Sequence, residues 1–241
     1  MRKLMYGLVA GMLFLASCSK KDVVTDNGGA GPLNEPGFGS SIAPFAGLPW
    51  QLPAGIALKE KIHYFEYCND DENAEKRKEW IGVPNSWLSY FAVCITFSNN
   101  TGEPIEIKLP PVILIESVDI EYQNGMIITN SATIDVPANG TVTLFSPVFC
   151  VNAAREAPLE VADEDGNLIE FELGPSAVPA ALKEIADILK TKNLSYALIT
   201  KADGTIDSQR LQQWSIIQDA IWEVTDGEGL TEEWRQKLRA L

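Results

Sequence analysis

Short runs of alternating apolar and smaller or polar side chains fill the middle of the chain, and turn-forming residues separate them. Alternation with a period of two is typical of strands that bury one face, and the first run, around Val93 and Ile95, is expected to be half-buried. The runs lie at 91–97, 105–109, 112–115, 127–129, 133–136 and 141–145. Short strands at this spacing predict a fold that is mainly β with α, namely an immunoglobulin-like antiparallel β-sandwich.

The last third of the chain changes to helical periodicity. Apolar residues recur there every three or four positions, which predicts helices over 180–192, 207–226 and 231–241. Pro179 fits the first turn of the first of these helices. The globular domain is therefore expected to span 42–241, with the β-sandwich over about 42–174 and a helical part over about 175–241.

The helix expected over 207–226 carries one residue that does not suit a buried stripe. Its stripe consists of Leu211, Trp214, Gln218, Ile221, Trp222 and Thr225. A primary amide removed from water costs free energy unless its donors and its acceptor are satisfied. Gln218 is then either a core glutamine hydrogen-bonded to a neighbouring carbonyl, or a glutamine whose amide has been consumed in a covalent bond.

The N-terminus has the pattern of a secretion signal. Residues 1–17 combine a short basic head with an apolar run that is too short for a mature membrane span. The sequence Leu-Ala-Ser-Cys at 15–18 resembles the lipobox of bacterial lipoproteins, which implies cleavage before Cys18 and lipidation of its thiol. Residues 18–41 are rich in Gly, Asn, Asp, Ser and Pro and are expected to form a flexible tether. The predicted location is the cell envelope, lipid-anchored at the outer membrane or the cell surface.

The charge balance argues against nucleic acid as a partner. The chain has 19 basic and 33 acidic residues and a formal net charge of −14. Cleavage of the leader would remove two of the basic residues and make the mature protein more acidic. An acidic surface repels phosphate backbones, and no basic stripe interrupts it.

Three cysteines remain after Cys18, an odd number in an oxidising compartment. A disulfide between Cys68 and Cys94 would link two predicted strands, and a pairing of Cys94 with Cys150 is the alternative. Strand alternation makes Cys150 an inward-facing thiol, although a small buried hydrophobe is a common role for a cysteine. The residues that share its strand face are Val142, Leu144 and Val148.

Two motifs resemble the bacterial thioester domains of surface adhesins. Phe-Cys-Val-Asn at 149–152 is similar to their aromatic-Cys strand, and Ile-Gln-Asp-Ala-Ile-Trp at 217–222 to their Gln-x-Ala-Ile-Trp helix. In place of the family's usual Thr, Ile217 precedes the glutamine. The resemblance implies an internal thioester between Cys150 and Gln218 that can acylate a partner amine. Phe149, Trp214, Ile221 and Trp222 would surround that bond, and the tryptophans could exclude water from it.

Two other functions stay open. In a non-covalent interaction or structural module, Cys150 would be an ordinary core thiol and Gln218 a satisfied core amide. In a cysteine hydrolase or transglutaminase, Cys150 would be the nucleophile and His63, the one histidine, its base. The sequence has no zinc spacing, calcium loop or dinucleotide fingerprint, so we expect neither a metal nor a cofactor. The expected partners are the membrane, through the lipid, and a protein or glycan that carries an amine. Because capture is single-use, we do not expect an enzyme.

Overall fold

Ten short strands and three helices make up the described part of the chain. The structure is a computed structural model, and it describes residues 33, 35–64, 92–158, 162–192 and 207–241. The strands are β1 (Ile56–Leu58), β2 (Ile62–Tyr64), β3 (Ala92–Asn99), β4 (Ile105–Lys108), β5 (Val112–Ser117), β6 (Gly125–Ile128), β7 (Thr133–Val136), β8 (Thr141–Pro147), β9 (Phe149–Cys150) and β10 (Glu170–Leu173). The predicted class, a mainly β antiparallel sandwich with a helical C-terminal part, is confirmed.

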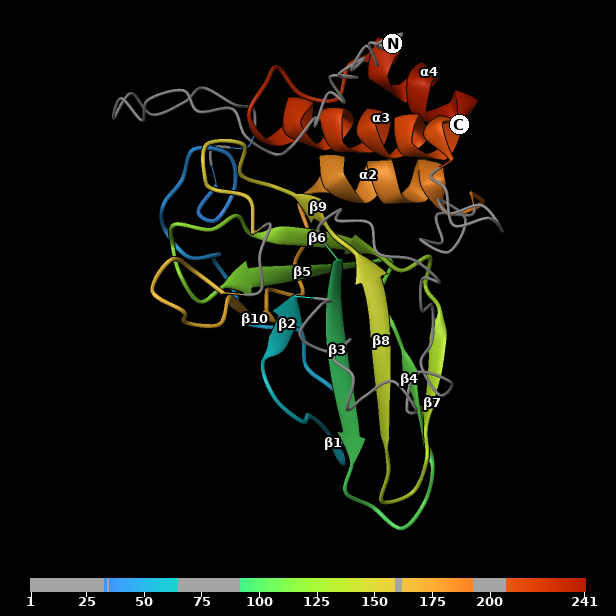
Figure 1. Cartoon of the computed structure of the whole chain (residues 1–241). Helices are drawn as coiled ribbons and strands as arrows, with labels where there is room; N and C mark the ends of the chain where they lie inside the picture. The colour runs from blue at the N-terminus through green and yellow to red at the C-terminus, as the bar shows by residue number, and fades with distance from the viewer. Residues whose placement is uncertain (1–32, 34, 65–91, 159–161, 193–206) are drawn as a thin grey trace, which may run out of the picture.

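Eight strands form one antiparallel sheet in the order β1-β3-β2-β10-β5-β6-β9, with β8 also paired to β3. The strands β4 and β7 form a separate two-stranded ribbon. Figure 1 shows β3 and β8 as long neighbours that project away from the helices, while β5 and β6 run crosswise directly beneath the helices. The strand β9 comes last in the hydrogen-bonded order, so it lies at an edge of the sheet.

The crosswise strands divide the interior into two cores because their alternate residues face opposite sides. On β5, Ile113 and Ile115 face one core, whereas Val112 and Leu114 face the other. The sandwich core lies between the sheet and the ribbon and includes Ile95, Phe97, Ile107, Ile134, Val148, Cys150 and Phe171. The helix-side core lies under the helices and includes Phe38, Met126, Phe149, Leu182, Ile185, Ile217, Ile221, Val224 and Leu238.

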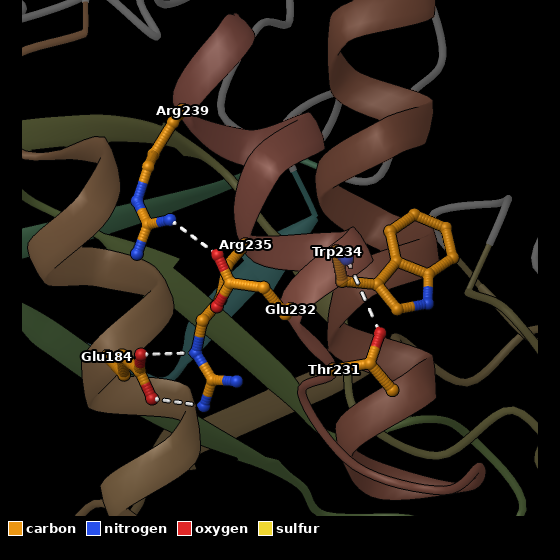
Figure 2. Close-up of polar contacts among 6 residues, drawn as sticks. All are labelled: Glu184, Thr231, Glu232, Trp234, Arg235 and Arg239. Carbon is orange, nitrogen blue, oxygen red and sulfur yellow. Dashed lines mark hydrogen bonds and ion pairs between the residues drawn. The ribbon is translucent and has the colours of Figure 1, made fainter.

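Three helices cover β5, β6 and β9 (Figure 1). They are α2 (Ala180–Leu189), α3 (Ser208–Thr225) and α4 (Glu232–Ala240), close to the three predicted ranges. A bidentate ion pair joins α4 to α2, with Arg235 Nε 2.7 Å from Glu184 Oε1 and the second nitrogen 3.0 Å from Oε2 (Figure 2). The Thr231 hydroxyl accepts a hydrogen bond from the Trp234 backbone N–H and caps α4.

Two expectations from the sequence need correction. The strand β3 was expected to be half-buried, but Ala92, Cys94 and Thr96 are buried as well as the alternate residues that face the sandwich core. The predicted tether of residues 18–41 also includes residues of the folded part, because Phe38 is buried in the helix-side core. An apolar ring that packs under the helices gains free energy by leaving water, so the folded part begins before residue 42.

No helix in the described ranges is both long enough and apolar enough to cross a membrane.

Candidate functional site

Cys150 lies on the edge strand β9, opposite Gly125 of β6. Its side chain is fully buried and contributes to the sandwich core, as the strand alternation from Val142 to Val148 predicts. Phe149 and Val151 lie on the other face of the strand and pack in the helix-side core. Cys150 therefore belongs to the partition between the two cores and directs its thiol away from the helices.

The side-chain amide of Gln218 forms two hydrogen bonds with the main chain of Cys150, one as acceptor and one as donor. The Cys150 N–H donates to Gln218 Oε1 at 2.8 Å, and Gln218 Nε2 donates to the Cys150 carbonyl at 2.8 Å. A residue in a strand directs its N–H and its C=O to the same edge, and at Cys150 that edge faces away from β6. The amide has a donor and an acceptor side by side, so it replaces the missing neighbouring strand at this one position.

Aromatic packing fixes the position of α3 along the direction of β9. The rings of Phe149 and Trp214 lie 5.8 Å apart between centroids, with planes tilted by 51°. Trp214 and Ile217 are buried, which holds the first half of the helix in place. Gln218 follows one turn after Trp214 and meets Cys150, the residue after Phe149. The two sequence motifs are thus brought together residue by residue.

The buried face of α3 differs from the predicted stripe. The fully buried positions include Ile217, Ala220 and Val224, whereas Gln218 and Trp222 are only half-buried. The cause is the position of the helix, which lies over the edge of the sheet rather than its centre. Gln218 is therefore at the margin of the buried face, where its amide reaches around the edge strand.

Trp222 and Ile221 lie on different sides of that margin. Ile221 is buried in the helix-side core, and Trp222 packs against the sandwich core, which contains Cys150. The Trp222 indole nitrogen is shielded from solvent, and no described residue accepts a hydrogen bond from it. Trp222 thus packs, half-buried, against the core to which the Cys150 thiol contributes.

A polar network that sequence reasoning missed holds the segment after β9. The Asn152 side chain accepts from the Asn124 N–H at 3.0 Å and donates to the carbonyls of Gly37 and Gly39 at 2.9 and 3.2 Å. Asn124 likewise donates to Gly37 and accepts from the Ser117 N–H. Both asparagines are fully buried. The Asn at the end of the Phe-Cys-Val-Asn motif was the only sequence signal for this network.

Gly39 brings the N-terminal segment against the end of α3. Its N–H donates to the Val151 carbonyl at 2.9 Å, and its φ is +57°. A Cβ atom at this position would lie 2.4 Å from the Thr225 carbonyl oxygen, so only glycine fits. Residues 37–39 therefore complete the surroundings of the strand that carries Cys150.

The described cysteines differ in chemical state. Cys94 is disulfide-bonded, whereas Cys150 is a thiol outside any disulfide. The alternative pairing of Cys94 with Cys150 is therefore wrong. Cys68 and Cys18 lie outside the described residues, so the Cys68–Cys94 disulfide and the lipidation of Cys18 stay predictions.

The structure does not bring His63 to Cys150 along the sheet. His63 lies on β2 opposite Cys94 and Glu170, and three strands separate β2 from β9 in the hydrogen-bonded order. Desolvation by burial lowers the pKa of His63 below its usual range, and the nearby carboxylates of Glu60 and Glu170 only partly oppose this shift. A hydrolase arrangement would need a base within hydrogen-bond reach of the thiol, so this geometry gives it no support.

The arrangement can do one of two things chemically. Gln218 can act as a permanent cap that satisfies the edge of β9, or its amide carbon can be the electrophile for the Cys150 thiol once that side chain rotates toward it. The described residues contain no group of three or more His, Cys, Asp or Glu side chains placed to hold a metal ion. No protein-family model matches the chain, and neither does a curated protein or a solved structure.

Proposed function

We propose that this protein is a surface-anchored lipoprotein for adhesion or interaction, which captures a partner amine through a thioester between Cys150 and Gln218. One observation carries the proposal: the Gln218 amide binds the main-chain N–H and C=O of Cys150 itself, each at 2.8 Å. The amide carbon therefore lies beside the residue that bears the thiol. Rotation about the Cys150 Cα–Cβ bond decides how closely sulfur approaches carbon.

The bond would form by loss of ammonia. The Cys150 sulfur attacks the Gln218 amide carbon, the C–N bond breaks, and the thiol proton leaves with the amide nitrogen as NH₃. The Cys150 N–H already donates to Oε1, so it would stabilise the negative charge that develops on that oxygen. Holding both groups in one contact supplies the proximity that an amide, a poor electrophile, requires.

Capture is the reverse exchange with a different amine. The lone pair of a deprotonated primary amine attacks the acyl carbon of Gln218, and the C–S bond breaks. The amine nitrogen loses one proton, the Cys150 sulfur regains one, and the partner is left in an amide bond to the Gln218 side chain. Each molecule can do this once, so the activity is covalent binding rather than catalysis.

Burial supports the survival of such a bond. Cys150 is fully buried, the neighbouring Phe149 packs against Trp214, and Trp222 packs against the core that contains Cys150. A site without bulk water protects an acyl group from hydrolysis. Membrane anchoring through a lipid on Cys18 belongs to the same proposal and is supported by the lipobox pattern.

A second function has one observation in its favour. The two hydrogen bonds at 2.8 Å already satisfy the Gln218 amide as a structural cap of an edge strand. In that case the protein is a non-covalent binding or structural lipoprotein module, and Gln218 contributes only to stability.

Intact mass spectrometry of the purified full chain, beside its Cys150→Ala variant, separates the two functions. With the thioester, the parent lacks one ammonia relative to its calculated mass, the variant does not, and methylamine converts the parent to an adduct. Gln212→Ala is the matched control, because Gln212 is an exposed glutamine of the same helix and its removal leaves the ammonia loss in place. A parent at full calculated mass that methylamine does not change would exclude covalent capture.

A further inference from the structure

One stretch at the start of the folded part is exposed, uncharged and rich in apolar residues. Residues 36–58 contain no Asp, Glu, Lys, Arg or His, although the whole chain has a formal net charge of −14. Most side chains of residues 40–51 are exposed, and we call these residues the uncharged strip. Leu48 and Ile42, which are 78% and 67% exposed, are the two most exposed large apolar residues in the described ranges. Figure 1 shows this blue segment on the outside of the molecule.

Backbone contacts and one buried ring fix the uncharged strip on the fold. The ring of Phe45 is buried beside that of Phe38, with 4.8 Å between the centroids. The Phe45 N–H donates to Glu116 at 2.9 Å, and the Leu48 carbonyl accepts from the Ser176 N–H at 3.0 Å. The fold therefore holds the apolar side chain of Leu48 out in solvent at a defined position.

Ionised groups beside the strip are bound to its main chain. The Arg155 guanidinium donates to the Ser41 carbonyl at 2.6 and 3.2 Å and to the Ala43 carbonyl at 3.3 Å. Glu116 accepts from the Phe45 N–H, as described above. Removing an ionised group from water costs much free energy unless the group is paired or hydrogen-bonded. This face can therefore approach an apolar phase at a lower cost than the acidic surface elsewhere.

The strip also lies close in sequence to the proposed lipid anchor. The chain from Cys18 to Glu35 can span at most about 60 Å, whatever its conformation. The strip begins a few residues after Glu35 and is the first extended exposed surface of the described part. A lipid on Cys18 would keep this surface at a high local concentration beside the bilayer, so a weak contact is enough for docking.

We infer that the uncharged strip docks on the lipid bilayer that holds the Cys18 anchor. Ile42 and Leu48 enter the boundary between head groups and acyl chains, where apolar side chains gain free energy by leaving water. The acidic faces cannot make this contact, because anionic lipids repel them. This inference rests on the lipid anchor of the proposed function and is independent of the thioester. It adds which face of the folded part lies against the membrane.

Spin-label accessibility on phosphatidylcholine vesicles tests this orientation. The protein is the lipidated chain, expressed at full length and carrying Cys150→Ala, which removes the free thiol found among the described cysteines. A nitroxide is attached through Gln51→Cys in the strip or through Glu103→Cys in the turn after β3, both at exposed positions. We expect the label at 51 to gain access to O₂ and to lose access to a polar nickel chelate. The label at 103 should stay accessible to the chelate.

Two double variants show which side chains hold the strip on the bilayer. Ile42→Ser with Leu48→Ser should lower the ratio of docked to undocked label at 51 about tenfold, because two apolar side chains no longer leave water. Val118→Ser with Ile120→Ser is the matched control. Val118 and Ile120 are 53% and 59% exposed but lie outside the strip, so the ratio should not change.

Each other outcome overturns the inference in a recognisable way. A label at 51 that is as accessible to the chelate as the label at 103, or an equal loss in both double variants, would exclude docking through the strip. A label at 51 that loses access to both reagents would mean that protein rather than lipid covers the strip. Intact mass reads the anchor separately: a chain without acyl groups removes the lipid anchor and this inference with it, whereas a lipidated chain with an exposed strip removes the docking alone.

Discussion

The far end of the sandwich and the junction beneath the helices satisfy their backbone hydrogen-bonding groups in different ways. At the far end, β3 and β8 pair without interruption from Ala92 opposite Pro147 to Ser98 opposite Thr141. At the junction, β9 contributes only two residues to its ladder with β6. Several other backbone groups there are satisfied by side chains, namely those of Asn124, Asn152 and Gln218.

The difference teaches where chemistry can be placed in this fold. A continuous ladder uses every backbone group, and its side chains only need to pack. A short edge strand capped by an amide brings that amide next to the main chain of the residue that bears a buried thiol. The junction is therefore where the proposed site lies, and its stability depends on individual polar side chains.

The largest expected effect is at the far end. Phe97 is fully buried in the sandwich core, opposite Leu58 and Val142 in register. Phe97→Ala should lower the free energy of unfolding by about 3–5 kcal/mol through lost burial and a residual cavity. Chemical denaturation measures this loss. If the thioester is present, the ammonia loss in the folded fraction should be unchanged, and its disappearance would contradict the separation of the two regions.

Asn152→Ala tests the junction. Removing this fully buried side chain leaves the Asn124 N–H and the carbonyls of Gly37 and Gly39 without their partner, so we expect a loss of about 2–3 kcal/mol. The variant should also expose the Cys150 sulfur faster than the parent does, to methylamine if the thioester is present and to a thiol reagent if it is not.

Asn99→Ala is the matched control for that variant. Asn99 is buried at the far end and donates to the carbonyls of Glu103 and Val136 at 2.8 and 3.2 Å. It should lose similar stability while the reactivity of Cys150 stays at the parental level. Equal reactivity in the two variants would mean that the junction is no more dependent on polar contacts than the far end.

The regular elements were predictable because their signals are local. Alternation located β7 at Thr133–Val136 and the three-to-four spacing located α3 to within one residue at each end. The inward position of Cys150 also followed from strand alternation through Val148. Each of these signals depends on neighbours within a few residues, which a sequence displays directly.

The contacts of the junction were not predictable, because they depend on where elements meet in space. The placement of Gln218 at the margin of α3 follows from the position of the helix over the sheet edge, which no periodicity encodes. The network from Gly37 to Asn152 joins residues more than a hundred positions apart, and a glycine-rich segment gave no sign that Phe38 would be buried. A cavity beside Trp222 depends on Trp234 of another helix.

A smaller effect is expected within the helical layer. The Thr231 hydroxyl caps α4 through a long hydrogen bond of 3.4 Å from the Trp234 N–H (Figure 2). Thr231→Ala should cost about 0.5–1 kcal/mol, near the lower end for helix caps, because the bond is long and exposed. Hydrogen exchange should report faster opening of α4 without a change in β3. Faster exchange throughout the sandwich would contradict an independent helical layer.

The smallest effect concerns the ion pair between α2 and α4, and it should depend on pH. The hydrogen bond from Arg235 holds the pKa of Glu184 below its usual range. A carboxyl whose pKa is lower in the folded state stabilises the fold above its unfolded pKa, and this contribution is lost as the pH falls through the folded pKa. Both side chains are partly exposed, so solvent screening keeps the contribution small. Glu184→Gln should lower the Tm slightly at neutral pH, and the difference from the parent should vanish once the pH falls below the lowered pKa of Glu184. A difference that persists in acid would mean that Glu184 contributes through packing rather than through its charge.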